Sequence, residues 1–203
     1  KKININAGNS GSLARLILGL LVKSKFKIRL IGDKSLSKRD FSRVIKPLRL
    51  FGVNIKSKNN KLPIELLGSD FLRPVTYYEN IGSAQVKSCI LLNALNTPGT
   101  TIIKSKKSRN HTELMLKFLN YPIKIQERKS FDKISIQGLQ QFKSFKYNVP
   151  GDISSASFFI VLTLLSKKSQ LVIENVNINK SRVGIITILN KMGANIKYKN
   201  KKL

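Results

Sequence analysis

Three apolar runs along the chain have the spacing of a helix, and each follows a short entry of small or polar residues. In the second run, Val86, Cys89, Ile90 and Asn93 fall at i, i+3, i+4 and i+7, which places them on one helix face. Each run therefore predicts a helix that begins just after its polar entry. The predicted helices lie within residues 8–21, 80–95 and 150–165.

A strand-like run, a second helix-like run and two short alternating segments follow each of these helices. The helix ends recur about every 70 residues, which is the signature of an internal repeat. We predict an α+β (α/β layered) fold of three βαβαββ units, with a strand before each first helix. The strands after the first helices are predicted at 26–33, 100–106 and 170–177, the second helices at 39–52, 109–120 and 181–193, and the closing strands within 53–68, 123–138 and 194–203.

Local signals refine two of these elements. Glu113 follows Asn110 by three positions, which is the spacing of a capping box and predicts a helix start near His111. Asn59-Asn60 lies between two alternating segments and predicts the turn of a hairpin.

Prolines mark further boundaries. Pro47 lies inside the predicted helix 39–52 and should kink or shorten it. Pro150-Gly151 follows a loop-like stretch and predicts a domain boundary. We therefore expect a first domain of two βαβαββ units and the first, truncated unit of a second domain, at residues 1–148 and 149–203 respectively.

The formal net charge of +28 arises mostly from lysines scattered along the whole chain. One interpretation is a nucleic-acid partner, because basic side chains neutralise phosphate. The charges form no single block, however, and the joint richness in Lys, Asn and Ile is typical of drift in an AT-rich genome. We do not expect nucleic acid to be a partner, although a basic surface would attract a small polyanion.

Several classes of site are not supported by the sequence. It contains no P-loop, HExxH, GxSxG or CxxC motif, and His111 has no acidic or cysteine companions that would make a metal site. Cys89 lies among apolar residues and predicts a buried thiol rather than a nucleophile. One cysteine excludes an internal disulfide and fits a reducing cytoplasm, and no apolar run is long enough for a membrane span.

Elements that bind anions remain as the candidate chemistry. The start of a helix offers unpaired backbone N–H groups, and the first helix of every unit has small or polar residues there. Ordinary capping, by Asn9 or Ser10 in the first helix, is the alternative explanation. We call the N-terminal end of such a helix, with the residues just before it, its entrance. If several entrances converge, they would form a strong anion site together with nearby donors, which are Arg15, Arg39, Ser83, Gln85, Lys87, Ser108 and Arg109.

Five ordered motifs then link the chain to a known family. They are GNSGSLAR, GDKSLSKR…RVIKPLRLFG, GSAQVKSCILLNAL, SRNHTELML and VPGDISSASFF, and together they span nearly the whole chain. In this order they resemble the 5-enolpyruvylshikimate-3-phosphate (EPSP) synthase family. The resemblance implies the enolpyruvyl transferase fold, an inside-out α/β barrel of two similar three-unit domains with the active site between them.

The resemblance also implies a reaction. The family transfers the enolpyruvyl group of phosphoenolpyruvate to the 5-hydroxyl of shikimate 3-phosphate and releases phosphate, the step before chorismate in aromatic amino-acid synthesis. It uses no metal and no organic cofactor. Both substrates carry a phosphate and a carboxylate, which agrees with a site built from anion-binding groups. We expect a cytoplasmic, monomeric bacterial transferase with these two small-molecule substrates and no membrane partner.

Three residues resemble the phosphoenolpyruvate side of the family's site. These are Asn9, Gly11 and Arg39, where Gly11 would let the ligand approach the backbone and Arg39 would clamp its phosphate or carboxylate. Arg15 is expected to order the loop rather than contact ligand. Many members have proline after the arginine that matches Arg39, whereas this chain has Asp40, which could pair with Arg39 or cap the following helix.

Five residues resemble the shikimate 3-phosphate side. Ser83, Ala84 and Gln85 match the family's second helix entrance, and Gln85 is expected to touch both ligands. Ser108 and Arg109 would complete the grip on the phosphate.

The family's catalytic groups are expected outside this segment. Its N-terminal Lys-Ser…Arg motif should precede Lys1, and its acid–base Asp and Glu should follow Leu203. Asp152 belongs to the third helix entrance and is not that acid. We expect no catalytic residue among these positions and no activity from the segment alone.

Three alternatives stay open at this point. A sibling enolpyruvyl transferase that acts on UDP-N-acetylglucosamine shares the fold, but its reactive loop cysteine has no counterpart here. An RNA-binding or RNA-end-processing protein would account for the basic charge. An inactive remnant would serve only as a structural module.

Overall fold

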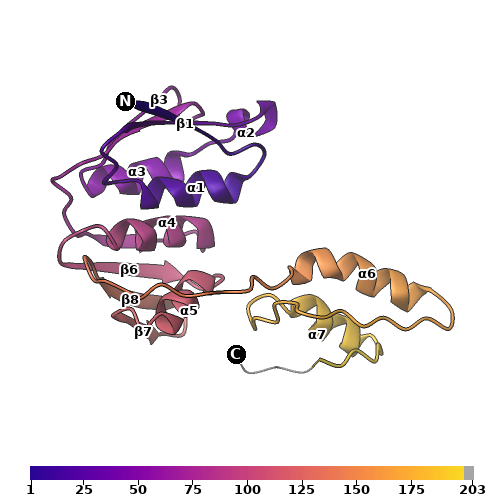
Figure 1. The fold of residues 1–203 in the computed structure, drawn as a ribbon. Helices are drawn as coiled ribbons and strands as arrows, with labels where there is room; N and C mark the ends of the chain where they lie inside the picture. Colours follow the sequence, from indigo (N-terminus) through magenta and orange to yellow (C-terminus); the bar gives the residue numbers. More distant parts are fainter. Residues whose placement is uncertain (199–203) are drawn as a thin grey trace. The chain divides into compact units, whose positions relative to one another are not determined.

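A computed structural model describes residues 1–198 of the chain (Figure 1). The chain divides into two compact units, the first Lys1–Lys143 and the second from Ser144 onward. The division falls in a stretch, residues 139–150, that contains no helix or strand.

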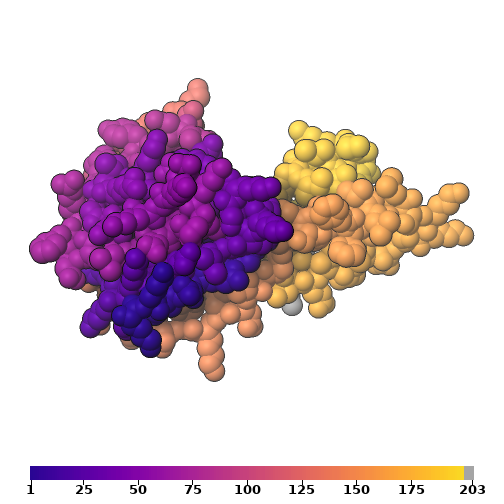
Figure 2. Space-filling view, turned by 90° about the horizontal axis from the view of Figure 1, so that it is seen from above, coloured from indigo at the N-terminus to yellow at the C-terminus, as the bar shows by residue number. Residues whose placement is uncertain are grey.

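The first repeat contains β1 (Lys2–Asn6), α1 (Gly11–Leu20), β2 (Lys27–Ile31), α2 (Lys34–Lys38), α3 (Ser42–Leu50), β3 (Asn54–Ser57) and β4 (Ile64–Leu67). Its sheet has the strand order β1-β2-β4-β3, with β1 parallel to β2 and the other neighbours antiparallel. The predicted hairpin is confirmed, since Asn59 and Asn60 take positive φ values of 52° and 55° between β3 and β4, a conformation that asparagine tolerates better than most residues. Residues of this repeat, coloured indigo to violet, form much of the surface of the first unit that Figure 2 shows.

The second repeat has the same topology. It contains β5 (Thr76–Glu79), α4 (Ala84–Ala94), β6 (Thr100–Lys106), α5 (His111–Phe118), β7 (Ile123–Glu127) and β8 (Phe131–Gln137). Its sheet has the order β5-β6-β8-β7, again with the first pair parallel and the others antiparallel. The predicted α+β architecture and the repeated βαβαββ unit are therefore confirmed for these two copies.

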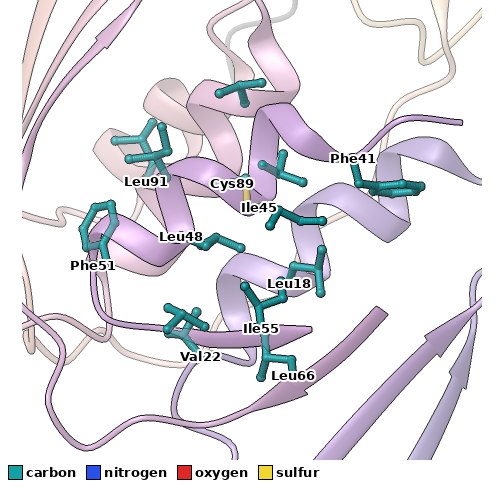
Figure 3. Close-up of a cluster of buried hydrophobic side chains, with 14 of the residues drawn as sticks. Leu18, Val22, Phe41, Ile45, Leu48, Phe51, Ile55, Leu66, Cys89 and Leu91 are labelled. Atoms are coloured by element: carbon teal, nitrogen blue, oxygen red, sulfur yellow. The ribbon is translucent and has the colours of Figure 1, made fainter. Parts of the chain in front are cut away.

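The hydrophobic core of the first unit lies among the helices and the two sheets, with α1, α3 and α4 between the strands (Figure 1). Leu18, Ile45, Leu48, Cys89 and Leu91 meet in its centre (Figure 3). Each is almost completely removed from solvent, and burying a leucine or isoleucine side chain stabilises the fold by about 1.5–3 kcal/mol. The predicted buried thiol at Cys89 is thus confirmed.

Two local predictions need correction. The helix predicted at 39–52 is shorter, because Arg39 ends the additional helix α2 instead of starting α3. Asp33 caps α2 by accepting a hydrogen bond from Leu36 N (2.7 Å). Pro47 lies within α3, which ends three residues later at Leu50. Helix α5 starts at His111 as predicted, but Asn110 makes no side-chain capping bond and Glu113 turns toward another helix.

The second unit contains α6 (Ile153–Leu165) and α7 (Gly184–Lys191) around a small cluster of Ile153, Ala156 and Ile186. The strand predicted at 170–177 is not formed. The one β-bridge within it that the described residues show joins Val176 to Gly151, and a ladder needs successive paired residues. Residues 194–198 likewise form no strand, and the rest of the strand predicted at 194–203 lies outside the described residues. Of the third predicted copy, the structure shows the two helices.

Candidate functional site

Helices α1 and α4 pack side by side in the same direction, so their entrances lie together. Near the entrances Gln85 Nε2 donates to Ser12 Oγ (2.7 Å), and at the far ends Asn96 Nδ2 donates to Leu20 O (3.4 Å). Serine caps both helices, since Ser10 Oγ accepts from Leu13 N and Ser83 Oγ accepts from Val86 N. The unpaired N–H groups of two helices therefore point toward one edge of the first unit.

Arg15 connects this shared edge to the segment that follows α2. Its Nη1 donates to Gln85 Oε1 (3.2 Å) and to Gly11 O (3.3 Å), and its Nη2 donates to Asp40 O (3.3 Å). Its guanidinium also lies 5.0 Å from the ring centroid of Phe41. Burial, followed by the neighbouring guanidinium groups, lowers the pKa of Arg15, although an arginine stays charged at neutral pH. Arg15 is thus an organising residue, as expected.

The residues predicted for phosphoenolpyruvate gather beside Arg15. Arg39 Nη2 lies 3.5 Å from Asn9 Oδ1, and Asn9 Nδ2 donates in turn to Asp33 Oδ2. A β-carbon on Gly11 would lie 3.0 Å from Arg39 Nη1, so glycine is what lets the guanidinium approach the backbone. The structure therefore brings Asn9, Gly11 and Arg39 into one cluster at the α1 entrance.

Asp40 accepts hydrogen bonds from Ser42, the first residue of α3, and is not paired with Arg39. Its Oδ1 accepts from Ser42 N (2.9 Å) and its Oδ2 accepts from Ser42 Oγ. These two hydrogen bonds from Ser42 are the main reason that the pKa of Asp40 is lowered. No ion pair between Asp40 and Arg39 occurs in the described part of the chain, so Asp40 does not neutralise the charge of Arg39.

The α4 entrance holds Ser83, Ala84 and Gln85, all half-buried. The loop before it is fixed by Glu79, whose carboxylate accepts from Ile81 N (3.1 Å) and Gly82 N (2.7 Å). Glu79 is buried, and Gly82 has the positive φ of 79° that glycine adopts at little cost. Sequence reasoning missed Glu79, although an acidic residue three positions before a turn glycine was an available signal.

Ser108 and Arg109 lie along the same side of the α4 entrance. A β-carbon on Gly82 would lie 3.3 Å from Lys107 O, so the chain just before Ser108 touches the loop that leads to Ser83. Arg109 is exposed, while Ser108 Oγ is buried and has no hydrogen-bond partner among residues 1–198. Lys107, the residue before Ser108, thus contacts the loop that leads to Ser83.

Lys87 was predicted as a group at the α4 entrance, and this prediction is wrong. Its side chain is fully buried and its Nζ lies 2.6 Å from Glu113 Oε1 on α5. Lys87 follows Ser83 by four positions, so both lie on one face of α4. This face is buried in the protein one turn after the helix begins. Neither the ion pair nor its partner was foreseen.

Other classes of site gain no support from the structure. Within residues 1–198 no three His, Cys, Asp or Glu side chains form a group suited to a metal ion. Complete burial raises the pKa of the Cys89 thiol to about 12. None of the helices described in the structure combines the length and apolar character that crossing a membrane requires.

Comparisons with known proteins identify the family. Residues 1–203 match the family described as EPSP synthase (3-phosphoshikimate 1-carboxyvinyltransferase). A curated relative from Ruthia magnifica subsp. Calyptogena magnifica, named 3-phosphoshikimate 1-carboxyvinyltransferase, is 44% identical over 199 residues, which is 98% of this chain and 45% of the relative. One of the same name from Streptococcus pyogenes serotype M4 is 42% identical over 97% of this chain and 46% of the relative.

A solved structure agrees as well. An EPSP synthase from Acinetobacter baumannii superimposes with a TM-score of 0.84 at 37% identity, covering 98% of this chain and 45% of that one. The chain thus spans about half the length of the relatives that it matches. Neither the UDP-N-acetylglucosamine transferase nor the RNA-binding alternative is favoured by these matches. With a family match over its whole length and a shared fold, this chain belongs to the EPSP synthase family.

Proposed function

We propose that this chain forms an anion-binding wall, the edge at the N-terminal ends of α1 and α4, of a 3-phosphoshikimate 1-carboxyvinyltransferase and holds both of its substrates. The observation that carries the proposal is the parallel pair of entrances of α1 and α4, joined through Arg15 and Gln85. Two ligands with two anionic groups each need several fixed donors, and such donors bind best when the fold orients them beforehand.

In this proposal the α1 entrance receives phosphoenolpyruvate. Arg39 offers a planar pair of donors that fits a phosphate or carboxylate, and Asn9 lies within reach of it. Gly11 lets the guanidinium groups of Arg39 and Arg15 lie close to the backbone at the start of α1, where any side chain would meet both of them.

The α4 entrance receives shikimate 3-phosphate. Ser83, Ala84 and Gln85 present the first turn of α4, and Ser108 with Arg109 adds a hydroxyl and a guanidinium beside it. Gln85 bonds to both Arg15 and Ser12, so it stands at the junction of the two entrances and is suited to contact both ligands.

The reaction explains why such a wall is useful. The methylene of phosphoenolpyruvate takes up a proton, and the 5-hydroxyl attacks the adjacent carbon and gives up its own proton. The adduct then loses phosphate together with a proton of the new methyl group, which restores the double bond of the enolpyruvyl product. Residues of this chain hold the two reactants next to each other, which makes the encounter effectively intramolecular. No residue of this chain is assigned a proton transfer, and we expect the 203-residue chain alone to show no turnover; a rate comparable to that of a full-length relative would contradict this.

The domain organisation is part of the same proposal. We assign residues 1–148 to the first domain and 149–203 to the start of a second one. Six of the 13 residues of α6 are apolar and exposed, among them Phe158 and Leu165, which fits a helix that belongs inside a larger domain.

Titration calorimetry on the 203-residue chain tests the proposal. We expect binding of shikimate 3-phosphate, a loss of about tenfold or more in Arg109→Ala, and only weak binding of RNA. Arg43→Ala removes a nearby exposed charge and is the control for net charge alone. Tight, salt-dependent RNA binding without shikimate 3-phosphate binding would overturn the proposal.

A further inference from the structure

A fully buried ion pair joins α4 to α5 behind the proposed shikimate 3-phosphate site. Lys87 Nζ lies 2.6 Å from Glu113 Oε1, and the two side chains are 0% and 3% exposed. A second polar contact lies beside the ion pair, between the residue after Lys87 and the residue before Glu113, where the hydroxyls of Ser88 and Thr112 are 2.6 Å apart. Both contacts connect the second turn of α4 to the first turn of α5.

Each partner of the ion pair is close along the chain to residues of the proposed site. Lys87 N donates to Ser83 O (3.1 Å), so Lys87 stacks directly behind the entrance serine. Glu113 lies in the first turn of α5, immediately after the segment that carries Ser108 and Arg109. Because both side chains are buried, neither touches a bound ligand, and any effect on binding passes through their neighbours.

Packing alone does not account for this pair. Two charges lose their hydration when they are buried, and apolar residues of similar volume often serve the fold as well or better. The second carboxylate oxygen, Glu113 Oε2, also has no hydrogen-bond partner in the described part of the chain. What a close buried ion pair adds is one favoured position of α5 against α4, because the two charges must stay together once water is excluded.

We infer that Lys87 and Glu113 are positioning residues that hold the Ser108-Arg109 segment at a fixed distance from the Ser83-Gln85 entrance. The inference rests on the proposed function, since it assigns the phosphate of shikimate 3-phosphate to the gap between these two segments. The pair thereby sets selectivity for the phosphorylated ligand over shikimate itself.

The test removes both charges while keeping the shapes of the side chains, in the double variant Lys87→Met/Glu113→Gln. The matched control carries the same two changes at an exposed ion pair, Lys27→Met/Glu65→Gln, where the atoms lie 2.8 Å apart. Titration calorimetry measures shikimate 3-phosphate and shikimate against both variants and the unchanged chain. Amide hydrogen exchange over residues 107–114 is measured on the same proteins without ligand.

We expect the double variant to stay folded and to lose about tenfold in affinity for shikimate 3-phosphate, with shikimate binding unchanged. Its amides at 107–114 should exchange faster, while the control matches the unchanged chain in every measurement. Equal loss for both ligands, or unchanged exchange at 107–114, would overturn the inference. If the double variant does not fold, the variant Glu113→Asp replaces it, because it keeps both charges but shortens the acidic side chain by one methylene. The same binding and exchange measurements, with the same expected results, then test the inference.

The two proposals fail in different ways. If the unchanged chain binds neither ligand, the proposed function is wrong, and the exchange measurement alone then decides whether the ion pair fixes α5. If it binds shikimate 3-phosphate and the double variant binds it equally well, the proposed function stands and the positioning role does not.

Discussion

Gly19 on α1 lies against the backbone of Cys89 on α4, so closely that a β-carbon on Gly19 would come within 2.2 Å of Cys89 O. No other residue type allows this approach. The contact lets the two helices pack backbone to backbone, and their entrances at the other end of α1 then meet through Gln85 and Ser12. The close crossing of the helices is therefore a condition for the shared edge on which the site depends.

Replacing Gly19 by alanine should therefore push α1 away from α4. We expect a loss of stability of about 1–3 kcal/mol, because a methyl group is forced against backbone rather than a movable side chain. Urea unfolding followed by circular dichroism measures it. Gly184→Ala is the control, since nothing lies within 4 Å of a β-carbon there. Equal stability of the two variants would show that the crossing is loose.

Arg15→Lys should weaken the site without removing its charge. A lysine ammonium is a single point and cannot reach Gln85, Gly11 and Asp40 together, as the arginine does. We expect shikimate 3-phosphate affinity to fall about fivefold to tenfold, a loss of roughly 1–1.4 kcal/mol, as Gln85 loses its orientation. Titration calorimetry provides the measurement. Arg49→Lys is the matched control, because Arg49 donates its side-chain hydrogen bond to Ile55 O, away from the entrances.

The stability of the first unit should depend on the ionisation of Asp33 in acid. The hydrogen bond from Asn9, followed by that from Leu36, lowers the pKa of Asp33 from its ordinary value of 3.8. A lowered pKa means that ionised Asp33 stabilises the fold above its ordinary pKa, and that this contribution is lost as the pH falls through the lower value in the folded chain.

Asp33→Asn keeps a capping side chain but cannot ionise. We expect it to be less stable than the unchanged chain near neutral pH and to approach it in stability as the pH falls below 3.8. Thermal unfolding between neutral and acidic pH reveals the difference. Asp70→Asn, at an exposed loop position, should give no such convergence. A stability gap that is constant over the whole range would contradict the role given to Asp33.

The thiol of Cys89 should report on opening of the core. It is fully buried with its pKa raised to about 12, so little thiolate exists in the folded chain. We expect no reaction with a disulfide reagent at pH 8 on the time scale of minutes, and full reaction in urea. Shikimate 3-phosphate should slow the residual reaction further, because a ligand that binds the folded state suppresses opening. Rapid reaction of the folded chain would show that the centre of the core is open to solvent.

The sequence predicted elements whose signals are local. Helical spacing at Val86 and Ile90 identified a buried face of α4, and Asn59 with Asn60 identified the hairpin turn. Helix α2 was missed although Asp33 and Leu36 carry a capping signal within four residues. The candidate residues at the α1 entrance were named from sequence motifs, and the structure places them together.

Features that depend on distant parts of the chain were not predictable. Lys87 reads as a solvated lysine near a helix start, and only the packing of α5 against α4 brings Glu113 to it. The segment 170–177 has the pattern of a strand, but pairing requires a neighbouring strand. Among the described residues, Val176 forms a single β-bridge, to Gly151. A sequence pattern indicates which secondary structure a segment can form, while its tertiary partners determine whether it forms.

The parallel packing of α1 and α4 has an energetic consequence. Two helices aligned in the same direction set like partial charges beside each other, and this repulsion is only weakly screened where side chains exclude water. An anion at the common edge would turn the repulsion into attraction toward a shared counter-charge. The parallel arrangement thus lowers the stability of the fold and, for the same reason, favours the binding of an anion. A bound anion should hold the N-terminal ends of the two helices together.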